Sequence, residues 1–106
     1  MAPDVEWRPT GAFIGLDGVY RGPDAIEEWM DTIRAEWEEF EVSLLEVLEE
    51  APDSLLVTER IWGRGRESGA EAEMRVYSAY GFDSEGRVNR RASFTELEPA
   101  REAFRS

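Results

Sequence analysis

The sequence contains no cysteine, histidine, lysine or glutamine. Without cysteine the chain can form no disulfide and offers no thiolate nucleophile, and without histidine it lacks an imidazole base. These absences exclude cysteine- and histidine-dependent hydrolases, and they exclude metal sites built from thiolate or imidazole ligands. We therefore expect neither a bound metal ion nor a cofactor.

Basic charge is also scarce and comes from arginine alone. Twelve arginines stand against 24 acidic residues, which gives a net charge of −12, and residues 1–53 hold this whole excess, with 15 acids against 3 arginines. A nucleic-acid backbone would be repelled, so no nucleic acid is expected as a partner. No apolar run approaches the roughly 18 residues of a membrane span, and the first residues lack the apolar stretch of a signal peptide. We expect a cytoplasmic protein with no membrane partner.

The chain of 106 residues is long enough for one domain, which we place at residues 1–106. Apolar residues recur at steps of three and four after Gly22-Pro23-Asp24, a typical helix start. This spacing predicts a helix over residues 23–38. Its apolar face consists of Ile26, Trp29, Met30, Ile33 and Trp37.

From Phe40 onward the apolar period changes from helical spacing to two, which indicates strands. The strands are expected at residues 40–48, 55–63, 73–82 and 87–97, with short ones earlier at 4–7 and 19–21 and a short helix after Glu98. The fold class is therefore α+β: a cone-shaped, curved antiparallel sheet wrapped on one main helix, with a short C-terminal helix.

Three segments carry a resemblance to a known family: Pro3-Asp4-Val5-Glu6-Trp7, the Tyr-Arg-Gly-x-x-Ala-Ile motif at residues 20–26, and Gly86-Arg87-Val88 leading to Phe94. In order and spacing they resemble the SnoaL-like (polyketide cyclase-like) group of the nuclear-transport-factor-2-like superfamily, which has a cystatin-like α+β fold. Family members usually begin with further helices, which this chain lacks. The resemblance implies a pocket inside the cone. It also implies a homodimer through the outer face of the sheet, where we expect Phe94, Ile61 and Tyr77.

The acid–base residues of two enzyme classes in this superfamily do not recur here. Where ketosteroid isomerases have a carboxylate before a proline, this chain has Arg8 before Pro9, and Ser78 stands at the position of their second acid. Limonene-type epoxide hydrolases have an Asp–Arg–Asp set. Arg60 matches the arginine of that set, but Trp62 and Ser93 stand at its two aspartate positions.

The same comparison implies that Arg60, Trp62, Ser78 and Ser93 face into the cone, and strand alternation adds others. The candidate ligand-binding residues are Arg60, Trp62, Tyr80, Ser78, Arg91, Met74, Trp29 and Ser93. On this register no carboxylate of the four-strand meander points inward. Arg90 and Arg91 straddle the two faces, so a slip of one residue would exchange them.

Arg60 is expected either to bind an anionic group of a ligand through its bidentate guanidinium or to pair internally with Glu6 or Asp17. Trp62 would stack on the ligand or fill space. Glu6 and Asp17 are the candidates for a general base, if burial raises the pKa of either carboxyl.

Two functions follow. The first is a pocket that binds a small anionic or carbonyl-bearing molecule, with isomerase- or cyclase-type proton transfer as the chemistry if the site is catalytic. The alternative is a non-catalytic dimerisation or partner-binding module.

Overall fold

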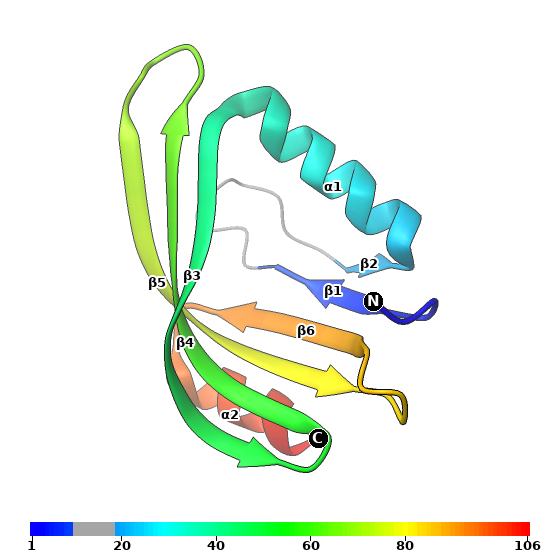
Figure 1. Cartoon of the computed structure of the whole chain (residues 1–106). Coiled ribbons are helices and arrows are strands. Elements are labelled where there is room, and N and C mark those ends of the chain that lie inside the picture. The colour runs from blue at the N-terminus through cyan, green and yellow to red at the C-terminus, as the bar shows by residue number, and fades with distance from the viewer. Residues whose placement is uncertain (10–18) are drawn as a thin grey trace.

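The structure is a computed structural model that describes residues 1–9 and 19–106. Six strands form one strongly curved sheet in the order β2-β1-β6-β5-β4-β3, and one helix lies on each side of it (Figure 1). The elements along the chain are β1 (Glu6–Arg8), β2 (Tyr20–Arg21), α1 (Pro23–Glu36), β3 (Trp37–Ala51), β4 (Ser54–Gly65), β5 (Glu71–Phe82), β6 (Val88–Phe94) and α2 (Leu97–Arg105). None of the described helices is long and apolar enough to cross a membrane.

The expected α+β fold is confirmed. Strands β3, β4, β5 and β6 form the predicted antiparallel meander, and β2 pairs antiparallel with β1. The sheet is nevertheless mixed, because β1 runs parallel to β6, with Trp7 opposite Arg91. This pairing places the first strand beside the last one, at the far end of the sheet from β3.

Helix α1 begins as predicted, with Pro23 in its first turn and Asp24 near its positive end. Ile26, Trp29 and Ile33 are buried under it, which confirms the predicted apolar face. The helix ends two residues earlier than expected. Trp37 has extended backbone angles and already pairs with Gly65 as the first residue of β3.

Helix α2 covers the opposite, convex side of the sheet, where it contacts β4, β5 and β6. Leu56, Ala79 and Ala92 lie side by side on neighbouring strands and are buried, as is Ala100 of the helix. Three alanines in this contact allow the helix to approach the strands closely. The sheet therefore has two distinct faces, a convex one packed on α2 and a concave one toward α1.

Gly63 on β4 lets the indole of Trp37 lie directly on the sheet. A Cβ atom added to Gly63 would lie 2.7 Å from Cε3 of Trp37, closer than real carbon contacts allow. The tryptophan is fixed at the junction of α1 and β3, so its ring has little room to withdraw. The absence of a side chain at residue 63 therefore positions the end of α1 over the sheet.

We predict that Gly63→Ala lowers the free energy of unfolding by about 1–3 kcal/mol, because the new methyl group overpacks this contact. Gly65→Ala is the matched control, since its nearest obstacle is the hydroxyl of Ser68, which can rotate away. Urea denaturation of both variants measures the difference. Equal stability of the two variants would contradict this role of Gly63.

Candidate functional site

A cavity of about 290 Å³ lies between α1 and the concave face of the sheet. Most of its lining is apolar or aromatic, which is typical of sites for small organic molecules. The lining residues are Trp7, Pro9, Trp29, Met30, Phe40, Val42, Ile61, Tyr80, Arg91 and Ser93. They come from β1, α1, β3, β4, β5 and β6, so the cavity exists only when the sheet curls beneath the helix.

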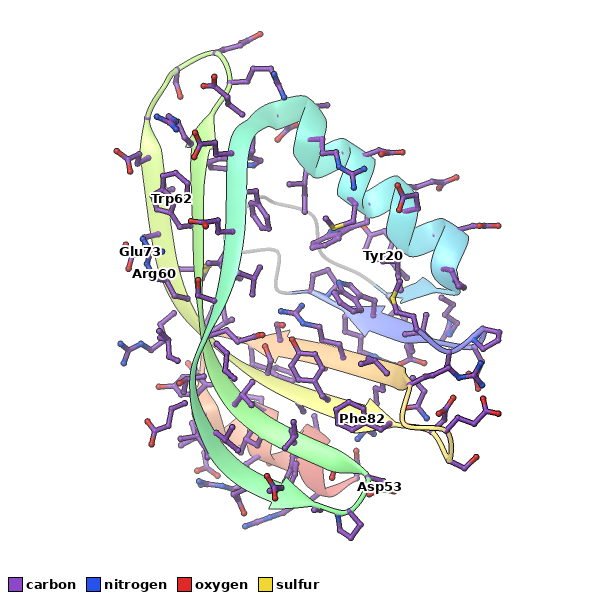
Figure 2. The ribbon with its side chains drawn as sticks, viewed as in Figure 1. Tyr20, Asp53, Arg60, Trp62, Glu73 and Phe82 are labelled. Carbon is purple, nitrogen blue, oxygen red and sulfur yellow. The ribbon has the colours of Figure 1, made fainter. Side chains whose placement is uncertain are left out.

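Aromatic rings form the wall of the cavity nearest α1. The Trp7 and Trp29 rings lie 6.2 Å apart and are tilted by 57°, and the ring of Tyr20, the register partner of Trp7, lies 6.3 Å from Trp29. Figure 2 shows Tyr20 between β2 and α1. Tilted contacts of this kind are favourable for aromatic rings and hold each ring in one orientation. The wall is therefore preformed rather than assembled by a ligand.

Three polar side chains from three adjacent strands meet on the concave face. Arg91 Nη2 donates a hydrogen bond to Glu59 Oε1 at 2.9 Å, and Arg91 Nε donates to Tyr80 Oη at 2.9 Å. Tyr80 Oη in turn donates to Glu59 Oε2 at 2.7 Å. The side chains of Arg91 and Glu59 are only 5% and 6% exposed, so the two charges neutralise each other away from water.

The surroundings of this network favour its neutral overall state. The Arg91 guanidinium lies over the Trp7 ring at 4.8 Å and near the Tyr80 ring at 5.5 Å, so aromatic faces flank the cation. Burial raises the pKa of the Tyr80 phenol, although the nearby charge of Arg91 acts in the opposite direction. Tyr80 therefore stays protonated and donates its one hydrogen to Glu59.

A second buried polar contact joins two hydroxyl groups beneath the cavity. Ser78 Oγ and Ser93 Oγ lie 2.8 Å apart on the neighbouring strands β5 and β6. Ser78 is fully buried, whereas Ser93 lines the cavity. The pair therefore links a fully buried hydroxyl to one that lines the cavity.

Most of the residues selected from the sequence lie where they were expected. Trp29, Tyr80, Arg91 and Ser93 line the cavity, and Ser78 is hydrogen-bonded to Ser93. Met74 is the register partner of Ile61 and so lies on the concave face, although it does not line the cavity. Of the two adjacent arginines, Arg91 is the buried one.

The expected inward orientation of Arg60 and Trp62 is wrong. Arg60 Nε lies 2.9 Å from Glu73 Oε1, and Trp62 Nε1 donates to Glu71 Oε1 at 2.9 Å, on the face away from α1. Figure 2 shows Arg60, Glu73 and Trp62 outside the curve of the sheet. Arg60 therefore pairs with Glu73 rather than with Glu6, and the hydrogen bond from Arg60 lowers the pKa of Glu73.

The inward residues of β4 are instead Glu59 and Ile61. The match of Arg60 to an epoxide hydrolase arginine implies that Arg60 faces inward. Because side chains alternate along a strand, this match assigns every residue of β4 to the wrong face. The alternative alternation, Leu55, Val57 and Ile61, is the more apolar one. It would have shown that Glu59 belongs to the buried face, and that this face does contain a carboxylate.

Of the two acids considered as a general base, Glu6 does not have the surroundings that this role needs. Glu6 lies 2.7 Å from Arg8 and 3.6 Å from Arg21, and the hydrogen bond from Arg8 lowers its pKa. The role of general base depended on burial raising this pKa, and that condition is not met. Asp17 lies outside the described residues. Within the part of the chain that the structure describes, no group of three or more carboxylates is placed to hold a metal ion.

A family model described as a SnoaL-like domain matches residues 1–91 of the chain. No curated protein matches this chain. An NTF2-like protein from Burkholderia thailandensis is 24% identical with a TM-score of 0.76, and the match covers all of this chain and 79% of that one.

Two further solved structures contain small molecules. A Mycobacterium tuberculosis protein in complex with estradiol-17beta-hemisuccinate is 21% identical, with a TM-score of 0.74 and coverage of 92% of this chain and 77% of that one. A Catenulispora acidiphila protein with a ketosteroid isomerase-like fold, in complex with trimethylamine, is 12% identical. Its TM-score is 0.75, and the match covers 93% of this chain and 72% of that one. At these identities the likeness concerns the fold.

We predict that replacing Arg91 destabilises the fold and that replacing Arg60 does not. Arg91→Met leaves Glu59 buried without its cation and lowers the free energy of unfolding by about 3–5 kcal/mol. Arg60→Met, the matched control, removes an exposed ion pair and leaves the urea midpoint unchanged.

Adding Glu59→Leu to Arg91→Met should recover most of the lost stability, since no buried charge is then left alone. Denaturation curves of the three variants measure these effects. A tolerated Arg91→Met would show that the network does not stabilise the fold.

Proposed function

This chain belongs to the SnoaL-like domain family, and we propose that it binds a small, mainly apolar organic molecule in the cavity between α1 and the sheet. The observation that carries the proposal is the aromatic wall of Trp7 and Trp29, which lines the same cavity as Ile61 and Tyr80. A wall of this kind binds by removing apolar surface from water. The volume of about 290 Å³ suits a molecule with a single ring or with two fused rings.

Two structural relatives support the proposal, because each contains a small molecule, estradiol-17beta-hemisuccinate in one and trimethylamine in the other. These ligands differ in size and character, so they favour binding as a shared capacity of the fold rather than one common ligand. The ligand of this chain must follow from its own lining.

Within the described part of the cavity wall, the acid–base groups favour binding over proton transfer. Glu59 accepts hydrogen bonds at both carboxylate oxygens, one from Arg91 and one from Tyr80. A proton taken up by Glu59 would weaken these hydrogen bonds and leave the buried charge of Arg91 unpaired. Isomerase- or cyclase-type chemistry would therefore need a different base, and the proposal assigns none.

Binding can be tested with prodan, a neutral fluorescent naphthyl ketone whose emission shifts to the blue in apolar surroundings. We expect a saturable blue shift with the unmodified protein. Val42→Trp should weaken binding at least about tenfold, because the added ring occupies the cavity mouth. Val47→Trp is the matched control: it lies on the same strand, is equally exposed at 45%, and does not line the cavity. No saturable shift, or equal loss in both variants, would refute the proposal.

We also propose that two copies of the chain associate through β3. The outer-face dimer expected from the sequence used Ile61, which lines the cavity instead, and Tyr77 and Phe94, which are only partly exposed. The large apolar side chains most exposed within the described sheet gather on β3: Val42, Leu44, Leu45 and Val47. A two-fold contact allows this one patch to cover itself.

Light scattering at micromolar concentration should report a dimer, and Leu44→Asp should shift it to the monomer. Ser43→Asp on the opposite face is the control for the added charge. Association should strengthen with salt, because β3 carries several acidic residues that repel their copies. A monomer at every salt concentration would refute the dimer.

A further inference from the structure

We infer that the cavity selects uncharged ligands that carry a carbonyl-type hydrogen-bond acceptor, and that the Ser93 hydroxyl binds this acceptor. The inference rests on the proposed function and specifies the ligand class for the same cavity. It follows from two features of the wall: a cation that is already neutralised, and a hydroxyl whose hydrogen has no other described acceptor.

Arg91 does not serve as an anion site, although it is the arginine that lines the cavity. Its nitrogens Nε and Nη2 are committed to Tyr80 and Glu59, and the carboxylate of Glu59 lies 2.9 Å from Nη2. A carboxylate ligand would bring a second negative charge to one buried cation, in surroundings that screen charge poorly. Trp7 covers the guanidinium at 4.8 Å and limits access to it further. The Glu59–Arg91 pair therefore excludes anions.

The direction of the Ser78–Ser93 hydrogen bond follows from burial. If Ser93 donated to Ser78, the hydrogen of the fully buried Ser78 would need another acceptor, and the described contacts of Ser78 provide none. A buried hydroxyl hydrogen without an acceptor is unfavourable, so Ser78 donates to Ser93. The Ser93 hydrogen is then free for a ligand.

Ser93 and Arg91 are two residues apart on β6, so their side chains project to the same face, and both line the cavity. In the neighbouring network, Tyr80 Oη, Arg91 Nε and Nη2 and both carboxylate oxygens of Glu59 are engaged with one another. The indole N–H groups of Trp7 and Trp29 also lack a described partner, but these atoms are buried. A ligand with one neutral acceptor therefore gives the Ser93 hydrogen a partner, whereas a purely apolar ligand leaves it without one.

The test uses three naphthalenes substituted at the same ring position: the methyl ketone, the ethyl compound and the carboxylate. Titrations followed by the indole N–H signals of nitrogen-15-labelled protein give the three dissociation constants. We expect the ketone to bind about tenfold more tightly than the ethyl compound, which corresponds to one hydrogen bond, and the carboxylate to bind most weakly.

Two variants assign these preferences to residues. Ser93→Ala should remove the advantage of the ketone over the ethyl compound while the ethyl compound binds as before. Glu59→Gln should strengthen carboxylate binding at least about tenfold, because it frees the charge of Arg91 while keeping the size of the side chain. Glu73→Gln is the matched control, since it removes the partner of Arg60 on the far face.

The outcomes separate this inference from the proposed function. If none of the three naphthalenes binds, the cavity is not a ligand site and both fail. If the ethyl compound binds but the carboxylate binds as tightly as the ketone, the proposed function stands and the inference is wrong. The ranking in the unmodified protein decides this even if Glu59→Gln does not fold, and a gain of carboxylate binding in Glu59→Gln cannot come from lost stability.

Discussion

The buried pairing of Glu59 with Arg91 is the constraint on which the rest of this structure depends. A buried charge is tolerated only when an opposite charge and hydrogen bonds replace its hydration. Here the two charges come from β4 and β6, and the Tyr80 hydroxyl from the intervening strand β5 bonds to both. Any shift of one strand by a single residue would send one member to the other face, so the network fixes the register of all three strands.

Because the register is fixed, the two faces of the sheet present different side chains to the two helices. The convex face presents Leu56, Ala79 and Ala92 to α2 and closes a tight core. The concave face presents Ile61, Tyr80 and Ser93 to α1, where the large rings of Trp7 and Trp29 hold the helix away from the strands. The cavity is the space that remains between these rings and the sheet. The same network sets the electrostatics of the cavity, because the opposite charges of Glu59 and Arg91 sum to zero.

The fold could be predicted because its signals are local and repeated. The spacing of Ile26, Trp29 and Ile33 allows one buried face on a helix, and the change of period at Phe40 allows only strands. The end of α1 was less predictable. Trp37 continues the helical spacing, but its backbone is extended because it pairs with Gly65, a residue 28 positions later in the chain. The parallel pairing of β1 with β6 likewise depends on residues that are far apart in sequence.

The sequence by itself determined the elements and their order, because periodicity and turn residues act over a few positions, and it identified Trp29, Tyr80, Arg91 and Ser93 among the residues that line the cavity. On β4 the family resemblance favoured Arg60 as the residue that faces the cavity, whereas the apolar alternation of the strand favoured Glu59. Glu59 and Arg60 are both charged, and each could be satisfied by a partner that sequence spacing does not reveal. Only the tertiary structure decided between them, by bringing Arg91 and Tyr80 to Glu59 inside the curve of the sheet and Glu73 to Arg60 outside it. The physical reason is that a charge is stable on the face where its counter-charge and solvent are found, and that face is a property of the assembled sheet.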